Sequence, residues 1–266
     1  VVQGGRINGT SEDGGCTCVI EGPFPPEAGL LRGLYPIVVR DTATGTEIAR
    51  FEAAINIMPD LTEYRGDTTD WTAIEDFTNA GITIHRVGRA KIELNGLDLT
   101  TASVNEIVYL GDHLDFSRPG AVAFDAEALP SFRNKPGRVT IFGLPYTSVP
   151  DILVNGRPAG DLVGDVSYVP PGPGTDGMLS FQTVHFSTFA AVPRVKVDSP
   201  MDGATLQEPQ CAVQGSVNDP GATVRVVVNG VPFTACAGSQ GEWALTVPLE
   251  EGENLLTVTA AASIGD

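Results

Sequence analysis

Between residues 199 and 260, short β-forming runs alternate with turn signals, and this alternation limits the fold more than any other feature of the chain. The run Thr223 to Val228 leads into Asn229-Gly230, the strongest short hairpin signal, and Val231 to Cys236 returns from it. Further strands are predicted at 213–217, 243–247 and 255–259, with turns at 218–221, 238–241 and 251–254. Short strands spaced in this way predict a small β-sandwich.

The order of residues in this stretch also carries a family resemblance. S-P-x-D-G-A-T is followed by G-S-V-N-D-P-G-A-T-V and later by V-P-L-x-E-G-x-N-x-L-T-V-T-A. This order resembles the bacterial Ig-like repeats of secreted and cell-surface proteins, including the accessory module of glucodextranase-type enzymes. The resemblance implies an Ig-like sandwich and an extracellular or cell-surface location, and it implies no catalytic residue.

The chain divides into two predicted units. Residues 194–266 form the Ig-like module, and residues 1–193 form a β-rich N-terminal region, with two subdomains split near 60–90 as an alternative. The boundary is placed at Ala191-Val192-Pro193, where the composition changes. The predicted fold class is therefore all-β, with tandem β-sandwich domains and one short helix in the N-terminal part.

The N-terminal region is predicted from local patterns alone. Tyr35 to Arg40 and Glu47 to Phe51 form a hairpin, with Ala53 to Met58 as an extension. The helix is predicted over 68–80, with Thr69 as N-cap and apolar residues at helical spacing. Further strands are predicted at 82–84, 90–94, 107–110, 121–124, 139–142, 152–154 and 166–169.

Residues 178–190 are predicted to form one closing strand. Its pattern F-x-T-x-H-F-S-T-F-A resembles the last strand of ZU5-like β domains of microbial surface proteins. Aromatic residues fall on both faces of such a strand, so we expect it to be buried on both sides, with His185 as a hydrogen-bonded core residue.

The charge balance limits the possible partners. With 33 acidic and 16 basic residues the net charge is −17, which disfavours nucleic acid and anionic membrane surfaces. No apolar run approaches the ~18 residues of a membrane span, so no membrane insertion is expected. A solvated acidic surface is one explanation of the charge, and calcium is the other, with Asp67, Asp70, Asn218 and Asp219 as candidate ligands in acidic turns. No other cofactor is indicated.

The four cysteines form two pairs. Cys211 and Cys236 lie in the Ig-like module, and a disulfide between them is predicted, with two buried thiols as the alternative. In a fully extended strand the Cβ atoms of Cys16 and Cys18 would lie too far apart for a disulfide, but the preceding Gly14-Gly15 suggests a turn that could bring them within reach.

The sequence holds no motif of catalysis. His85, His113 and His185 lie in separate segments without metal-binding spacing, and no G-x-S-x-G or P-loop motif occurs. His113 and Asp115 could offer two ligands on one strand face, although the segment is more typical of a charged edge. A glycosidase pair could be hidden among the acidic residues, but the predicted loops are short for a cleft. The chain is therefore predicted not to be an enzyme.

Two functions remain. The first is a non-catalytic structural or adhesive protein of the bacterial cell surface, as a subunit of a surface layer, appendage or filament. The alternative is a carbohydrate-binding segment of a secreted polysaccharide-degrading enzyme, and hence glycan partners. Sugar binding favours an exposed platform of aromatic rings, which two Trp and five Tyr residues supply poorly.

The Ig-like pattern also suggests an assembly. A seven-stranded module needs one more strand after Ala260, and the predicted strands end there. Either residues beyond 266 supply it, or a neighbouring subunit does by strand addition at the open C-terminal edge, with Val1 to Ile7 as a candidate donor. The expected partners are copies of the same chain or other surface proteins.

Overall fold

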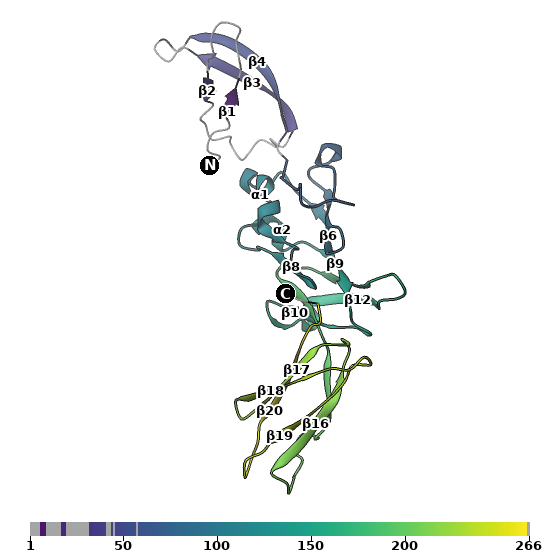
Figure 1. Ribbon diagram of the computed structural model, residues 1–266. Helices are drawn as coiled ribbons and strands as arrows, with labels where there is room; N and C mark the ends of the chain where they lie inside the picture. The colour runs from purple at the N-terminus through teal and green to yellow at the C-terminus, as the bar shows by residue number, and fades with distance from the viewer. Residues whose placement is uncertain are drawn as a thin grey trace.

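The computed structural model describes residues 6–8, 17–19, 32–40, 44, 46–56 and 58–264. It is built mostly of antiparallel strands, with two short α-helices, and the all-β sandwich fold is confirmed. Figure 1 shows the strands grouped in successive parts along the molecule, with the β3–β4 hairpin and the C-terminal strands at opposite ends.

The first four strands form two separate hairpins. β1 (Arg6–Asn8) pairs with β2 (Thr17–Val19), and β3 (Arg32–Arg40) pairs with β4 (Glu47–Asn56). The hairpin predicted from Tyr35 to Phe51 is therefore confirmed, and its second strand extends to Asn56.

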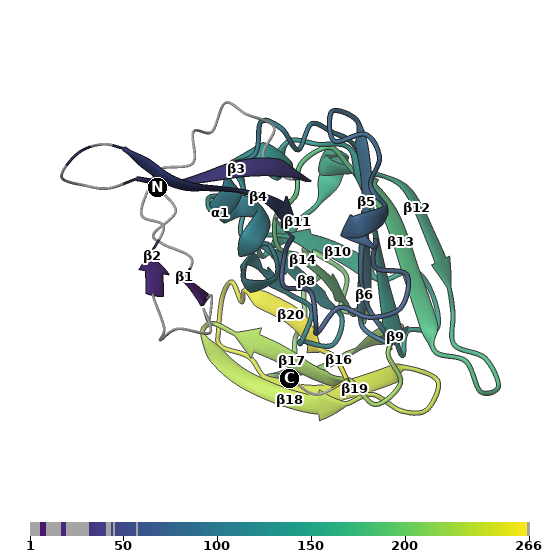
Figure 2. The same cartoon turned by 90° about the horizontal axis from the view of Figure 1, so that it is seen from above.

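Two five-stranded sheets form the part that we call the middle sandwich, and Figure 2 shows them as separate layers. One sheet has the order β11-β10-β14-β8-β7 and the other the order β12-β13-β9-β6-β5. The strands of the first are β7 (Leu114–Asp115), β8 (Ala121–Phe124), β10 (Asp151–Val154), β11 (Arg157–Pro158) and β14 (Phe189–Val192). Those of the second are β5 (Ala80–Arg86), β6 (Ala90–Leu97), β9 (Gly137–Leu144), β12 (Val163–Val169) and β13 (Gly177–Thr183).

The helices do not lie where the sequence predicted them. The predicted helix over 68–80 is wrong, because only the 3-10 turn η1 (Trp71–Ala73) forms there, capped by Asp70. The carboxylates of Asp70 and Asp76 accept hydrogen bonds from the backbone N–H groups two residues later, and such local bonds compete with helical ones. Further 3-10 turns are η2 (Gly111–His113) and η3 (Gly160–Leu162).

The two α-helices are α1 (Val104–Val108) and α2 (Pro130–Arg133), so the strand predicted at 107–110 is also wrong. A capping box fixes the start of α1: Ser103 and Glu106 each accept a hydrogen bond from the other's backbone N–H. The buried Glu106 carboxylate also accepts from the backbone N–H of Ser131, so one side chain joins both helices.

The predicted closing strand 178–190 is divided between the two sheets. β13 ends at Thr183, Val184 is 70% exposed, and β14 begins in the opposite sheet at Phe189. The Thr183 hydroxyl accepts a hydrogen bond from the backbone N–H of His185, which stabilises the bend. His185 is exposed and its ring contacts the Asn134 side-chain oxygen (2.7 Å), so its prediction as a core residue is wrong.

The C-terminal sandwich consists of two three-stranded sheets, β15-β16-β19 and β18-β17-β20. Its strands are β15 (Val195–Ser199), β16 (Gln210–Val217), β17 (Thr223–Val228), β18 (Val231–Cys236), β19 (Glu242–Pro248) and β20 (Leu256–Ala261). The five strands predicted between 213 and 259 are confirmed as β16 to β20. Asn229 and Gly230 both have positive φ, as the hairpin signal requires.

Buried apolar side chains form two separate clusters, one in each sandwich. The first draws on residues 64–191 and contains the large rings of Tyr146, Phe181 and Phe189, while the second draws on residues 211–247 and consists mainly of valines around Trp243. The predicted boundary at Ala191-Val192-Pro193 covers the last two residues of β14 and the first residue of the link to β15. Independent folding of the two units stays a prediction.

Candidate functional site

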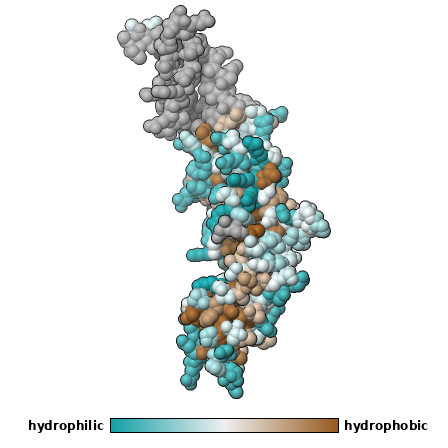
Figure 3. All heavy atoms as spheres, in the orientation of Figure 1, coloured by the Kyte–Doolittle hydropathy of each residue, from teal (hydrophilic) through white to brown (hydrophobic). Residues whose placement is uncertain are grey.

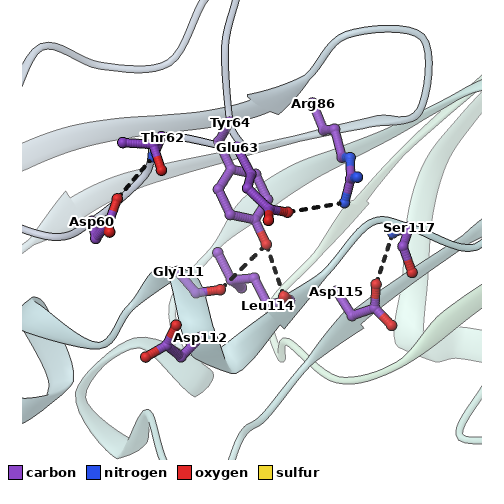
Figure 4. A pocket seen from close by; sticks show the side chains of 10 residues that line it. All are labelled: Asp60, Thr62, Glu63, Tyr64, Arg86, Gly111, Asp112, Leu114, Asp115 and Ser117. Carbon is purple, nitrogen blue, oxygen red and sulfur yellow. Dashed lines mark hydrogen bonds and ion pairs between the residues drawn. The ribbon is translucent and has the colours of Figure 1, made fainter.

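A shallow pocket of about 340 Å³ lies in the middle sandwich, between the 60–64 loop, Arg86 at the end of β5, and the η2–β7 segment (Figure 4). Tyr64 stands at its centre and donates a hydrogen bond to the carbonyl oxygen of Leu114 (2.7 Å). Arg86 lies 3.6 Å from the Glu63 carboxylate, and Asp115 accepts from the backbone N–H of Ser117 (2.7 Å). The polar groups of these residues are therefore engaged with neighbouring residues in the same pocket.

Burial and hydrogen bonding set the protonation states of Tyr64 and Asp115 in this pocket. Burial raises the pKa of Tyr64 to about 12, so its hydroxyl stays neutral at physiological pH. Hydrogen bonds from the hydroxyl and the backbone N–H of Ser117 lower the pKa of Asp115, which stays ionised. The pocket thus presents the ionised carboxylate of Asp115 beside the Glu63–Arg86 ion pair. His113 pairs with Asp125 (3.6 Å), so His113 and Asp115 have different partners and do not form the two-ligand site considered from the sequence.

The joint between the two sandwiches is the second candidate, and it is centred on Asn218, directly after β16. The Asn218 side-chain amide donates to the carbonyl oxygens of Ser148 (2.9 Å) and Val149 (3.2 Å) of the middle sandwich. Its side-chain oxygen accepts from the backbone N–H of Arg194 (2.8 Å), in the segment that connects the sandwiches.

The Asn218 backbone adds to these bonds. Its carbonyl oxygen accepts from the backbone N–H of Thr147 (2.7 Å), and its N–H donates to the Arg194 carbonyl oxygen (3.2 Å). One buried residue of the C-terminal sandwich is thereby bonded to both the middle sandwich and the connecting segment. Because side-chain and backbone groups each have partners, a rotation of one sandwich against the other breaks several of these bonds together.

Asp219 lies next to Asn218 and is fully buried. Its carboxylate accepts hydrogen bonds from the backbone N–H of Ser263 (2.7 Å) and from the Ser263 hydroxyl (2.6 Å). This fixes the segment after β20, where Ile264 packs against the core of the middle sandwich beside Gly120. The segment before β15 and the segment after β20 therefore both lie at the end of the C-terminal sandwich that meets the middle sandwich (Figure 1).

Two tyrosines support the joint from the middle sandwich. The Tyr146 hydroxyl donates to the carbonyl oxygen of Ala191 (2.9 Å), and the Tyr168 hydroxyl donates to the carbonyl oxygen of Tyr146 (2.6 Å). Burial raises the pKa of both, that of Tyr168 to about 12, and the negative charge of Asp219 raises them further. On the surface, the Arg194 guanidinium binds the Asp151 carboxylate (2.8 Å). The joint thus combines hydrogen bonds, an ion pair and apolar packing.

The four candidate calcium ligands do not come together. Asp67 is exposed and lies 3.8 Å from His85 and 3.9 Å from Lys91, while Asp70 caps η1. Asn218 and Asp219 belong to the joint, where their side chains hold protein groups. Among the described residues, no group of three or more His, Cys, Asp or Glu side chains could hold a metal ion.

The cysteines of the C-terminal sandwich are both free thiols in the structure. Cys211 is buried on β16 and desolvation raises its pKa, whereas Cys236 is exposed at the end of β18 in the other sheet. The predicted Cys211–Cys236 disulfide is not formed in this structure, because one side chain points into the core and the other into solvent. Cys16 lies outside the described residues, and Cys18 is described only as part of the backbone of β2.

Comparison of the chain with protein-family models, with curated proteins and with solved structures finds no match in any of the three. No helix in the part of the chain that the structure describes has the length and apolarity needed to span a membrane. The joint residues Thr147, Tyr146, Tyr168 and Ser263 were missed from the sequence. The turn Asn218-Asp219-Pro220-Gly221 was recognised locally, but its hydrogen-bond partners in the joint lie 24 to 71 residues away along the chain, where no local signal reaches.

Proposed function

We propose that this protein is a non-catalytic structural or adhesive protein of the bacterial cell surface, a subunit of a surface layer, appendage or filament. The observation that supports this proposal is the joint at Asn218. A protein that transmits load or spans a distance needs domains whose relative orientation is fixed, and a buried, hydrogen-bonded joint supplies that property. The resemblance of residues 199–260 to Ig-like repeats of surface proteins points in the same direction.

The carbohydrate-binding alternative has less support. Both tryptophans are buried, Trp71 at 6% and Trp243 at 3% exposure, so neither contributes an exposed ring. Among the described side chains, Tyr109 is the one aromatic ring that is largely exposed, at 51%. A sugar-binding platform favours several exposed rings in one plane.

Labelling of intact cells that produce the protein tests the proposal. An antibody against the C-terminal sandwich should decorate the cell surface, and the protein should stay with the cell envelope after washing. Recovery in the cytosol, or only as free protein in the medium, would contradict a structural role at the surface. A glycan array tests the carbohydrate-binding alternative. A structural protein should show no selective glycan binding, whereas a carbohydrate-binding segment should.

A further inference from the structure

Three Asn-Gly pairs lie wholly in the part of the chain that the structure describes: Asn95-Gly96, Asn155-Gly156 and Asn229-Gly230. All three asparagines are exposed. An asparagine followed by glycine is chemically reactive, because glycine has no side chain that hinders its backbone nitrogen from reaching the amide of the asparagine side chain. The surroundings of each pair therefore decide which of them can react in the folded protein.

Asn155 and Asn229 are held in tight turns. Their φ angles are 51° and 49°, and the strands on either side pair directly across each turn, β10 with β11 and β17 with β18. The Asn155 side-chain oxygen accepts a hydrogen bond from the Ser187 hydroxyl (2.6 Å). The Asn229 side-chain oxygen accepts from the backbone N–H of Leu255 (2.9 Å), and its amide nitrogen donates to the Asn254 side chain (3.0 Å). Rotation of either asparagine therefore breaks both turn and side-chain bonds.

Asn95 lies instead at a bulge of β6. The register between β5 and β6 shifts between Ala80 and Ile82, so Asn95 and Gly96 together face the single residue Gly81. On the other side of β6, the register with β9 ends before Asn95. The pair Asn95-Gly96 thus falls outside the regular ladders on both sides of its strand.

The side chain of Asn95 is also less restrained than those of the other two asparagines. It has no hydrogen bond to any residue that the structure describes, and its oxygen lies over Gly81, 3.6 Å from the position that a Cβ there would take. The Asn95 backbone N–H reaches the Pro136 carbonyl oxygen at 3.5 Å, which is a long hydrogen bond. Fewer bonds therefore oppose a rotation of Asn95 than of Asn155 or Asn229.

Water has access to this pair. Asn95 and Gly96 are both exposed, and many residues on the face of the middle sandwich that Figure 3 shows are hydrophilic. A reaction that consumes water can therefore be completed at this site without opening the core.

We propose that Asn95 is a site of spontaneous deamidation in the folded protein. The backbone nitrogen of Gly96 attacks the side-chain carbonyl carbon Cγ of Asn95, a new C–N bond closes a succinimide ring, and the bond from Cγ to the amide nitrogen breaks. Ammonia leaves with the proton of the Gly96 N–H. Water then opens the ring at either carbonyl, which gives aspartate or isoaspartate and a more negative chain. This inference does not depend on the proposed function.

Peptide mass spectrometry tests the site, because trypsin places each pair in its own peptide, residues 92–118, 139–157 and 226–266. The folded chain is kept at mildly alkaline pH, and the mass gain from amide to carboxylate is followed in each peptide. Methylation by an isoaspartate methyltransferase is the second readout. Because turn and side-chain hydrogen bonds must open first at Asn155 and Asn229, we expect Asn95 to react at least about tenfold faster than either.

Three controls separate the structure from the sequence. In concentrated urea the restraints are lost, so the rates of the three pairs should converge. In Asn95→Gln the mass gain of peptide 92–118 should disappear, since the longer side chain closes its ring far more slowly, and this distinguishes Asn95 from Asn105 in the same peptide. Ser187→Ala removes the hydrogen bond to Asn155 and should make Asn155 react faster.

Three results would overturn the proposal. The first is a rate at Asn95 in the folded chain that is no greater than the rates at Asn155 and Asn229. The second is a preference for Asn95 that persists unchanged in urea, which would assign it to the neighbouring sequence instead of the bulge. The third is an Asn155 rate that Ser187→Ala leaves unchanged, since side-chain restraint would then not control the reaction. Cell-surface labelling is independent of all three results.

Discussion

The middle and C-terminal sandwiches share a two-sheet architecture but differ in the size of their sheets and in the side chains of their cores. The middle sandwich has five strands in each sheet, a core rich in aromatic rings, and short or bulged edge strands. The C-terminal sandwich has three strands in each sheet and a core composed mainly of valine. Because small units bury a smaller share of their surface, we expect the middle sandwich to be the more stable unit and the C-terminal sandwich to depend on contacts with it.

Each sandwich contains one buried tryptophan, so the comparison can be measured directly. Trp71 lies in the middle core and Trp243 in the C-terminal core. Replacing either by Phe leaves a single tryptophan, whose fluorescence reports the unfolding of one sandwich in urea.

Phe189→Ala should have the largest effect. Phe189 is fully buried and its ring lies 5.2 Å from that of Phe181, so its removal leaves a cavity and should lower the free energy of unfolding by about 3–5 kcal/mol. The Trp71 transition should move to lower urea, and the Trp243 transition should move much less. Val184→Ala, at a 70% exposed site, is the control and should change stability by less than about 0.5 kcal/mol. Equal shifts of both reporters would show that the sandwiches unfold as one unit.

Asn218→Ala should weaken the joint. The variant leaves the carbonyl oxygens of Ser148 and Val149 and the N–H of Arg194 without their partner, and each buried polar group left unpaired costs about 1–3 kcal/mol. We expect the Trp243 transition to move to lower urea and to separate from the Trp71 transition. Gln214→Ala, at an exposed position on β16, should change neither. Coincident, unshifted transitions in Asn218→Ala would exclude a stabilising joint.

Alkaline pH should destabilise the middle sandwich first. The folded-state pKa values of Tyr64 and Tyr168 are raised from 10.0 to about 12, and that of Tyr146 is also raised. The unfolded chain therefore loses these protons at lower pH than the folded chain does, so the free energy of unfolding is unaffected below pH 10 and falls between pH 10 and pH 12. Urea titrations at pH 9, 10 and 11, followed by Trp71, measure this fall. A stability that is constant up to pH 11 would mean that these hydroxyls are solvated.

Tyr168→Phe should have the smallest effect. The variant removes the hydrogen bond from the Tyr168 hydroxyl to the carbonyl oxygen of Tyr146, which contributes about 1 kcal/mol. It should also reduce the slope of stability against pH above pH 10. Tyr109→Phe serves as the matched control, because Tyr109 is 51% exposed and should affect neither quantity. A pH slope that is unchanged in Tyr168→Phe would remove this residue from the explanation of alkaline sensitivity.

The C-terminal sandwich could be predicted from the sequence more completely than the middle sandwich. In the C-terminal sandwich, strand and turn signals are local: Asn229-Gly230 fixes the β17–β18 hairpin, and alternation fixes which valines face the core. In the middle sandwich the local signals compete. The spacing of Trp71 and Ile74 indicates a helix, but the Asp70 and Asp76 side chains bond to nearby backbone instead.

Other features of the middle sandwich were present in the sequence but were not recognised. Ser103 and Glu106 have the spacing of a capping box and mark the start of α1. The run 178–190 is apolar enough for one strand, yet two sheets share it. Local sequence patterns could not predict the joint, because Asn218 and Ser148 lie 70 residues apart and only the folded sandwiches bring them together.

The central claim is that the joint fixes the orientation of the two sandwiches, and residual dipolar couplings measure that orientation directly. Backbone couplings of the middle and C-terminal sandwiches, recorded in one weakly aligned sample, should give one common alignment tensor for the unchanged protein. In Asn218→Ala the two tensors should differ in magnitude, as expected when domains move independently. Different tensors in the unchanged protein would contradict a fixed joint.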